Sequence, residues 1–103
     1  MGLRLDLGNG YSYEFTSWAP DRSIPENAKR YEGVPDVEKY GLILTCPHTT
    51  GGVTFDGPVQ QAVEPKRPKW PVVQWEPLTL EGSILRDECK CHGFIRAGKW
   101  VSA

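Results

Sequence analysis

The sequence has little of three features that assign proteins to broad classes: net charge, long apolar runs and paired cysteines. Its 12 basic and 13 acidic residues give a formal net charge of -1, so no general basic field favours binding to nucleic acid. No apolar run approaches the roughly 20 residues that a membrane helix needs. The N-terminus also lacks the apolar stretch of a signal peptide. These absences predict a soluble intracellular protein with no membrane partner.

The number of cysteines is small and odd. Three cysteines argue against a closed disulfide framework, and a reducing compartment would keep them available as thiolates. A chain of 103 residues predicts one domain, spanning residues 1–103, with a core of modest size. Eleven glycines and nine prolines indicate many turns and little helix. We therefore expect a fold that needs a further source of stability, such as a bound metal.

Alternating apolar and polar residues predict an all-β fold, a small antiparallel sheet of consecutive hairpins. The clearest hairpin is expected over residues 3–17, where period-two patterns flank Gly8-Asn9-Gly10. A short helix through Arg30 is expected after Ser23 as its cap, and a single turn at residues 35–38. Residues 56–71 read as a long proline-rich loop. The remaining strands are expected at 40–46, 53–55, 72–75, 78–80, 83–85, 93–96 and 99–101.

All cysteines and histidines of the chain fall in two short clusters. These are Cys46-Pro47-His48 and Cys89-Lys90-Cys91-His92. Thiolate and imidazole are the ligands that zinc prefers, and a structural zinc site needs four of them. We therefore predict a structural zinc held by Cys46, His48, Cys89 and either Cys91 or His92, since neighbours on a strand point to opposite faces. The alternative is a set of buried cysteines and surface histidines without a metal.

Other chemistry has weaker support. His92 could act as a general base beside a metal-bound water, but the motifs of zinc deaminases and of His-Glu-x-x-His proteases are absent. Lys66, Arg67, Lys69 and Trp70 mix cations with an aromatic ring, as single-strand binders do. A solvated loop whose tryptophan packs on the sheet explains this segment better, and nucleic acid is not an expected partner.

Most of the chain from about residue 20 resembles a group of small uncharacterised proteins from actinobacteriophages and their hosts. That group is similar to a broader bacterial family with Cys-x-Cys, a later Ser-Ile, and Cys-x-x-His before an aromatic-Ile pair. The family positions correspond here to Cys46, His48, Cys89 and His92, with His48 in place of a second cysteine. The segments that carry the resemblance are residues 21–27, 46–48, 51–55, 75–84 and 89–101.

The resemblance implies a metal site and a phage or prophage origin, and no established activity. We therefore expect a non-enzymatic phage accessory protein that acts in the host bacterial cytoplasm by binding a host protein. Two alternatives remain open at this point. One is a zinc-dependent enzyme that uses the Cys/His cluster, and the other is a component of the virion or of its assembly.

Overall fold

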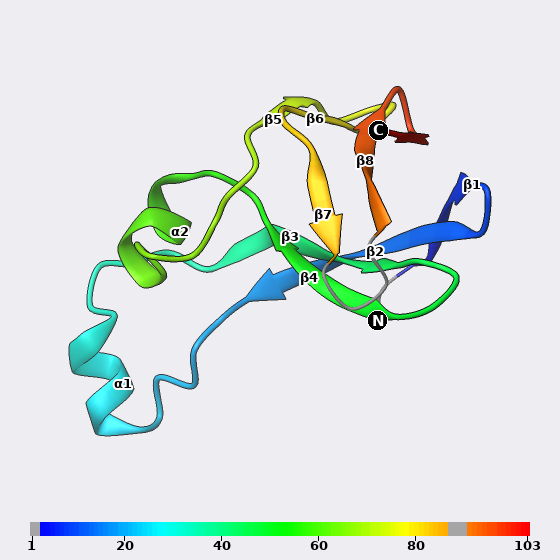
Figure 1. The fold of residues 1–103 in the computed structure, drawn as a ribbon. Coiled ribbons are helices and arrows are strands. Elements are labelled where there is room, and N and C mark those ends of the chain that lie inside the picture. The colour runs from blue at the N-terminus through cyan, green and yellow to red at the C-terminus, as the bar shows by residue number, and fades with distance from the viewer. Residues whose placement is uncertain (1–2, 87–90) are drawn as a thin grey trace.

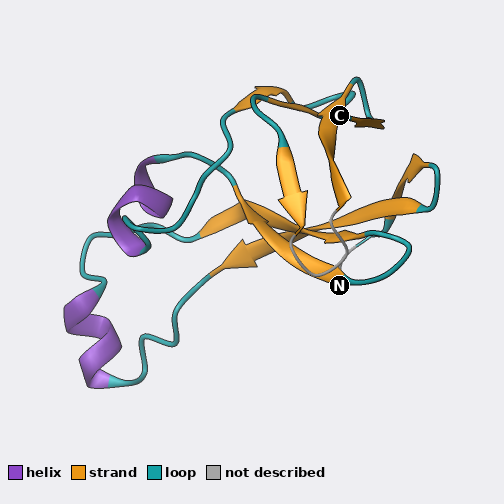
Figure 2. Cartoon of the chain, viewed as in Figure 1, coloured by secondary structure: helices purple, strands orange, loops and turns teal. Residues whose placement is uncertain are grey.

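The structure is a computed structural model that describes residues 3–86 and 91–103, and it is built mainly of antiparallel strands (Figures 1 and 2). The expected all-β fold is confirmed. The described strands do not form one sheet, however. They are divided into a four-stranded sheet, a two-stranded sheet and a three-stranded sheet.

The four-stranded sheet has the strand order β1-β2-β3-β4, so each strand pairs with the next along the chain. The expected first hairpin is confirmed, and its turn uses positive φ angles at Gly8, Asn9 and Gly10. The strand expected at residues 53–55 begins earlier than predicted, at Thr50, because Gly51 and Gly52 already pair with β3. The strands are β1 (Leu5–Gly8), β2 (Tyr11–Trp18), β3 (Val37–Thr45) and β4 (Thr50–Thr54).

The other two sheets come from the C-terminal third of the chain and lie above the four-stranded sheet in Figure 1. In the three-stranded sheet, β8 is central, and β7 and β9 are its edges. The hairpin joining β8 to β9 confirms the expected closing hairpin. The strands are β5 (Val72–Gln74), β6 (Thr79–Leu80), β7 (Ile84–Arg86), β8 (Cys91–Arg96) and β9 (Lys99–Ser102).

One hydrophobic core joins these sheets. Each contributes the alternate side chains of its inner face, as a half-buried sheet requires. The ring of Tyr11 on β2 stacks on Trp100 of β9, with 4.2 Å between ring centroids, and ties the first sheet to the third. The buried core residues are Leu7, Tyr13, Leu42, Leu44, Val53, Phe55, Leu78, Leu80, Ile84, Ile95 and Trp100.

Both helices of the described residues are short, and both begin with proline: α1 (Pro25–Arg30) and α2 (Pro58–Val63). The expected first helix is confirmed, but Ile24 occupies its N-cap position, and Ser23 donates its hydroxyl hydrogen to Asp21 instead. Helix α2 was missed within the predicted loop. The predicted turn at residues 35–38 is wrong, since β3 begins at Val37. Neither helix has the length and apolar character that crossing a membrane requires.

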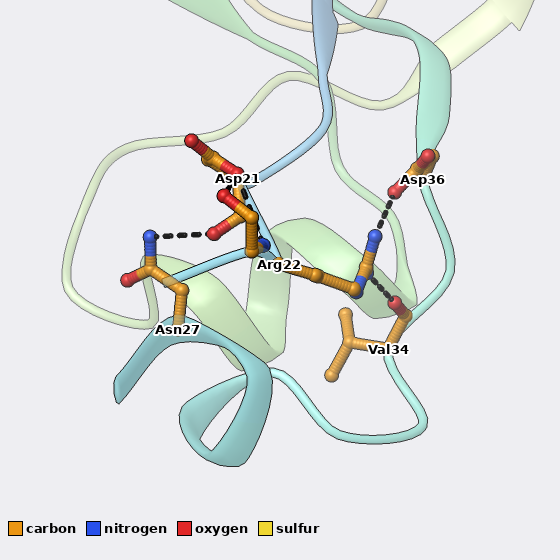
Figure 3. A network of polar contacts seen from close by, with 6 residues as sticks. Asp21, Arg22, Asn27, Val34 and Asp36 are labelled. Carbon is orange, nitrogen blue, oxygen red and sulfur yellow. Dashed lines mark hydrogen bonds and ion pairs between the residues drawn. The ribbon is translucent and has the colours of Figure 1, made fainter. Parts of the chain in front are cut away.

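The segment carrying α1 extends away from the sheets and is held by polar contacts (Figure 3). The guanidinium of Arg22 lies 2.6 Å from the carboxylate of Asp36 and also donates to the carbonyl of Val34. The amide of Asn27 donates to the carbonyl of Asp21. Because α1 has no buried residue, these exposed contacts and the edge-to-face packing of Tyr31 on Trp18 fix the segment.

Candidate functional site

The first predicted metal cluster lies where β3 ends and the chain turns into β4. Cys46 continues the inward alternation of Leu42 and Leu44 and is buried. Its Sγ accepts a hydrogen bond from the Thr49 backbone N–H at 3.3 Å, and its own N–H donates to the Thr49 carbonyl at 2.8 Å. His48 is exposed at the same turn. A backbone N–H directed at sulfur stabilises thiolate character, as a metal ligand requires.

The second predicted cluster is divided by the strand that carries it. Cys89 lies outside the described residues. Cys91 and His92 are the first two residues of β8, and the expectation that they point to opposite faces agrees with the burial of the strand. Cys91 shares its face with buried Gly93 and Ile95, whereas His92 is exposed on the other face. Cys91 therefore lies on the side of the core, as Cys46 does.

The described residues contain no group of three or more His, Cys, Asp or Glu side chains placed to hold a metal ion. Because Cys89 lies outside the described residues, this finding does not test the predicted four-ligand set. The structure places Cys46 and Cys91 on the sides of their strands that face the core, and it places His92 on the opposite side.

Beside His92, the outer face of the three-stranded sheet carries a serine. Strand pairing places Ile84 opposite Gly93 and Leu85 opposite His92, so Ser83 lies diagonally across from His92. Ser83 and His92 are both exposed, and alternation puts both on the face opposite the core. Diagonal neighbours in an antiparallel pair are roughly 7–8 Å apart at Cα, within reach of long and aromatic side chains.

The backbone at Ser83 is fixed by its neighbours. Gly82 has a φ of +90°, a conformation that favours glycine, so the chain turns sharply just before the serine. The indole N–H of Trp70 donates to the Ser83 carbonyl at 3.0 Å. The N–H of Glu81 donates to the carbonyl of Pro71 at 2.9 Å. The segment 70–71 therefore holds the residues on both sides of Gly82.

The other serines of the C-terminal four-fifths of the chain do not share this face. Ser102 lies opposite Gly93 on β9, on the same side as buried Trp100 and therefore opposite to His92. Ser23 lies at the start of the α1 segment, where its hydroxyl is bonded to Asp21. Among these three serines, Ser83 is therefore the one that the sheet places diagonally across from a histidine.

Two further clusters have structural explanations. The ammonium of Lys39 lies 4.8 Å from the ring centroid of Phe15 and 5.2 Å from that of Trp75, in a hollow on the side of the molecule. These aromatic rings therefore already have a cation. In the basic loop, Lys69 donates to backbone carbonyls and the half-buried Trp70 turns to Ser83. This agrees with the expectation of a tryptophan packed against the sheet.

Sequence reasoning treated Ser83 only as the start of a strand leading to the metal cluster. No local motif such as Gly-x-Ser-x-Gly surrounds it, because it follows Glu81-Gly82 and precedes Ile84. The pairing of β7 with β8 brings Ser83 toward His92. That register could not be read from alternation alone.

Comparison with known proteins gives one family. No curated protein and no solved structure matches the chain. The model of one protein family matches residues 19–103, which include both Cys/His clusters, Ser83 and the whole three-stranded sheet. That family is described as the bacterial ubiquitination-like system serine protease, BubE, and the chain belongs to it.

Proposed function

We propose that the chain is a serine peptidase in which Ser83 is the nucleophile and His92 the general base. The observation that carries the proposal is the shared outer face of β7 and β8, where both residues are exposed and diagonal to each other. The family to which the chain belongs is described as a serine protease, which supports the proposal. The other two serines within the matched residues 19–103, Ser23 and Ser102, are weaker candidates because they lie away from this face.

The chemistry follows the general pattern of serine acyl transfer. The Ser83 hydroxyl attacks the carbonyl carbon of a peptide bond while His92 takes its proton, and the leaving amine departs with that proton. Water then attacks the acyl-serine, His92 again accepts and returns the proton, and the free carboxylate leaves. The bond from Trp70 to the Ser83 carbonyl and the turn at Gly82 hold the nucleophile in place.

Cleavage of an acetylated random-sequence decapeptide library, followed by mass spectrometry, tests this function. We expect Ser83→Ala and His92→Gln each to lower cleavage at least about 1,000-fold. Ser102→Ala is the matched control, because it removes a serine of the same sheet from the opposite face and should retain cleavage. Equal loss in all three variants, or undiminished cleavage by Ser83→Ala, would reject the assignment.

A zinc site is proposed beside this centre as a structural element, held by Cys46, His48, Cys89 and Cys91. Two observations support the fit: the Thr49 N–H directed at the Cys46 sulfur, and the core-facing position of Cys91. Choosing Cys91 as the fourth ligand leaves His92 available for proton transfer. Such a metal contributes folding energy and would hold together the ends of β3 and β8. We expect Cys46→Ser to lose bound zinc, measured by elemental mass spectrometry, whereas His92→Gln should retain it.

The biological setting stays a prediction. We keep as a prediction that the chain is an accessory phage protein that binds a host protein in the bacterial cytoplasm. The geometry does not test this role, and the family match supports only a related bacterial family. A non-enzymatic binding role and the peptidase function predict different results for the Ser83→Ala variant. The binding role expects Ser83→Ala to leave partner binding and biological effect intact, so this variant distinguishes the two.

A further inference from the structure

We infer that the outer edge of β7 is a docking edge for an extended peptide. The peptide would form backbone hydrogen bonds with Leu85, two residues from Ser83. This inference rests on the proposed peptidase function and names its substrate class: an unfolded segment that binds as an added strand. Strand β7 is an edge of its sheet, since the order is β7-β8-β9. An edge strand offers backbone donors and acceptors to another chain.

The direction of the backbone groups on β7 follows from β9. The N–H of Ala103 donates to the carbonyl of His92 at 2.9 Å, so the backbone groups of His92 point toward β9. In an antiparallel ladder the direction alternates, so the groups of Gly93 point toward β7 and bond Ile84. Leu85, which is opposite His92, therefore directs its N–H and C=O away from β8.

An independent contact agrees with this assignment. Ser83 has the same parity as Leu85, and its carbonyl is taken by the Trp70 indole, a group outside the three-stranded sheet. Trp70 therefore closes the edge at Ser83. Within residues 3–86 and 91–103, the outward N–H and C=O of Leu85 make no hydrogen bond.

The side chains at this edge favour a substrate with apolar residues. The Leu85 side chain is 58% exposed and shares its face with Ser83. On the same face, half-buried Phe94 and exposed Val101 continue the apolar surface across β8 and β9, and the Arg96 guanidinium lies 4.1 Å from the Phe94 ring centroid. A peptide paired with Leu85 would set alternate side chains beside this surface. Because Trp70 closes the edge at Ser83, the paired segment would end beside Leu85, and the peptide would leave the edge there, two residues from the Ser83 hydroxyl.

Amide hydrogen exchange tests the edge without relying on catalysis. The Ser83→Ala chain, labelled with ¹⁵N, is mixed with the acetylated random-sequence decapeptide library, and exchange is followed at each amide of β7. We expect exchange at Leu85 to slow at least about tenfold. The amides of Ile84 and Arg86 already face β8 and should change less than about twofold. Unchanged exchange at Leu85 would overturn the inference. Protection that appears without peptide as protein concentration rises would also overturn it, because a second copy would then occupy the edge.

A matched pair of variants, made in the chain that keeps Ser83, distinguishes this inference from the proposed function. Leu85→Pro removes the outward N–H and is tolerated at an edge strand, whereas Leu85→Ala keeps the N–H. We expect kcat/KM for the library to fall at least tenfold in Leu85→Pro and less than threefold in Leu85→Ala. Equal losses of kcat/KM in the two Leu85 variants would contradict the docking edge but not the peptidase function. Absence of any Ser83-dependent cleavage would reject the peptidase function, and Leu85 protection in the exchange experiment would then stand as peptide binding.

Discussion

Replacing Gly93 with alanine should be among the most damaging single-methyl changes in the chain. Gly93 lies between His92 and Phe94 on β8, and its inner side is covered by Trp100. An added Cβ would lie 2.5 Å from the Val101 carbonyl oxygen and 2.6 Å from Cζ2 of the Trp100 indole. These neighbours are backbone and a buried ring, so β8 and β9 must separate or the ring must move.

The expected cost is about 3 kcal/mol, at the upper end of typical overpacking in a core. For a domain of about 100 residues, this lowers Tm by roughly 12–24 °C. Urea unfolding followed by tryptophan fluorescence measures it, with the free energy of unfolding taken from the transition. Because the same packing orients β8, peptide cleavage should fall with stability.

Gly52→Ala is the matched control for this experiment. Gly52 is also a strand glycine, but it is exposed, and its added Cβ would meet only the tip of Arg67 at 3.2 Å. Alanine in place of a strand glycine should stabilise β4 by about 0.5–1 kcal/mol. The reasoning is refuted if Gly93→Ala unfolds at the same urea concentration as the unmodified chain. Trp100 would then not cover β8, and the outward placement of His92 would lose its support.

Three further predictions concern single contacts. Trp70→Phe removes the hydrogen bond to the Ser83 carbonyl and should lower kcat about tenfold with little change in KM, measured by steady-state cleavage. Burial, and then a hydrogen bond to a carboxylate, raise the pKa of Tyr40. The stability from neutral Tyr40 is therefore fully present below about pH 10 and is lost as pH rises further. Urea midpoints between pH 8 and 11 should fall less steeply in Tyr40→Phe. Arg22→Ala breaks an exposed ion pair with Asp36 and should cost less than about 1 kcal/mol by thermal unfolding.

Most strands could be predicted because the residues of each hairpin alternate. Leu42 and Leu44 face the core, and the glycine-rich turn after β1 gives a local signal. Helix α2 was missed because prolines dominate its surroundings. Pro58 occupies the start of the helix, where no backbone hydrogen bond is lost, and Val59 packs inward. The division into three sheets depends on contacts between distant segments, which periodicity does not encode.

The candidate site was predictable only in part. The clustering of cysteines and histidines drew attention to His92. Alternation along a strand predicted that His92 and Cys91 point to opposite faces, in agreement with the burial of β8. The partner of His92 on the outer face could not be found by spacing, because Ser83 lies nine positions earlier in the chain and alternation does not fix the register of β7 against β8. Sequence reasoning therefore favoured metal ligation for a histidine that the fold places beside a serine.

The most direct test of the central claim is mass-spectrometric mapping of the chain after reaction with a fluorophosphonate, which labels activated serines. The account predicts a single adduct on Ser83, which is lost in His92→Gln and retained in Ser102→Ala. An adduct on another serine, or equal labelling of Ser83 with and without His92, would contradict the assignment of these two residues as nucleophile and base.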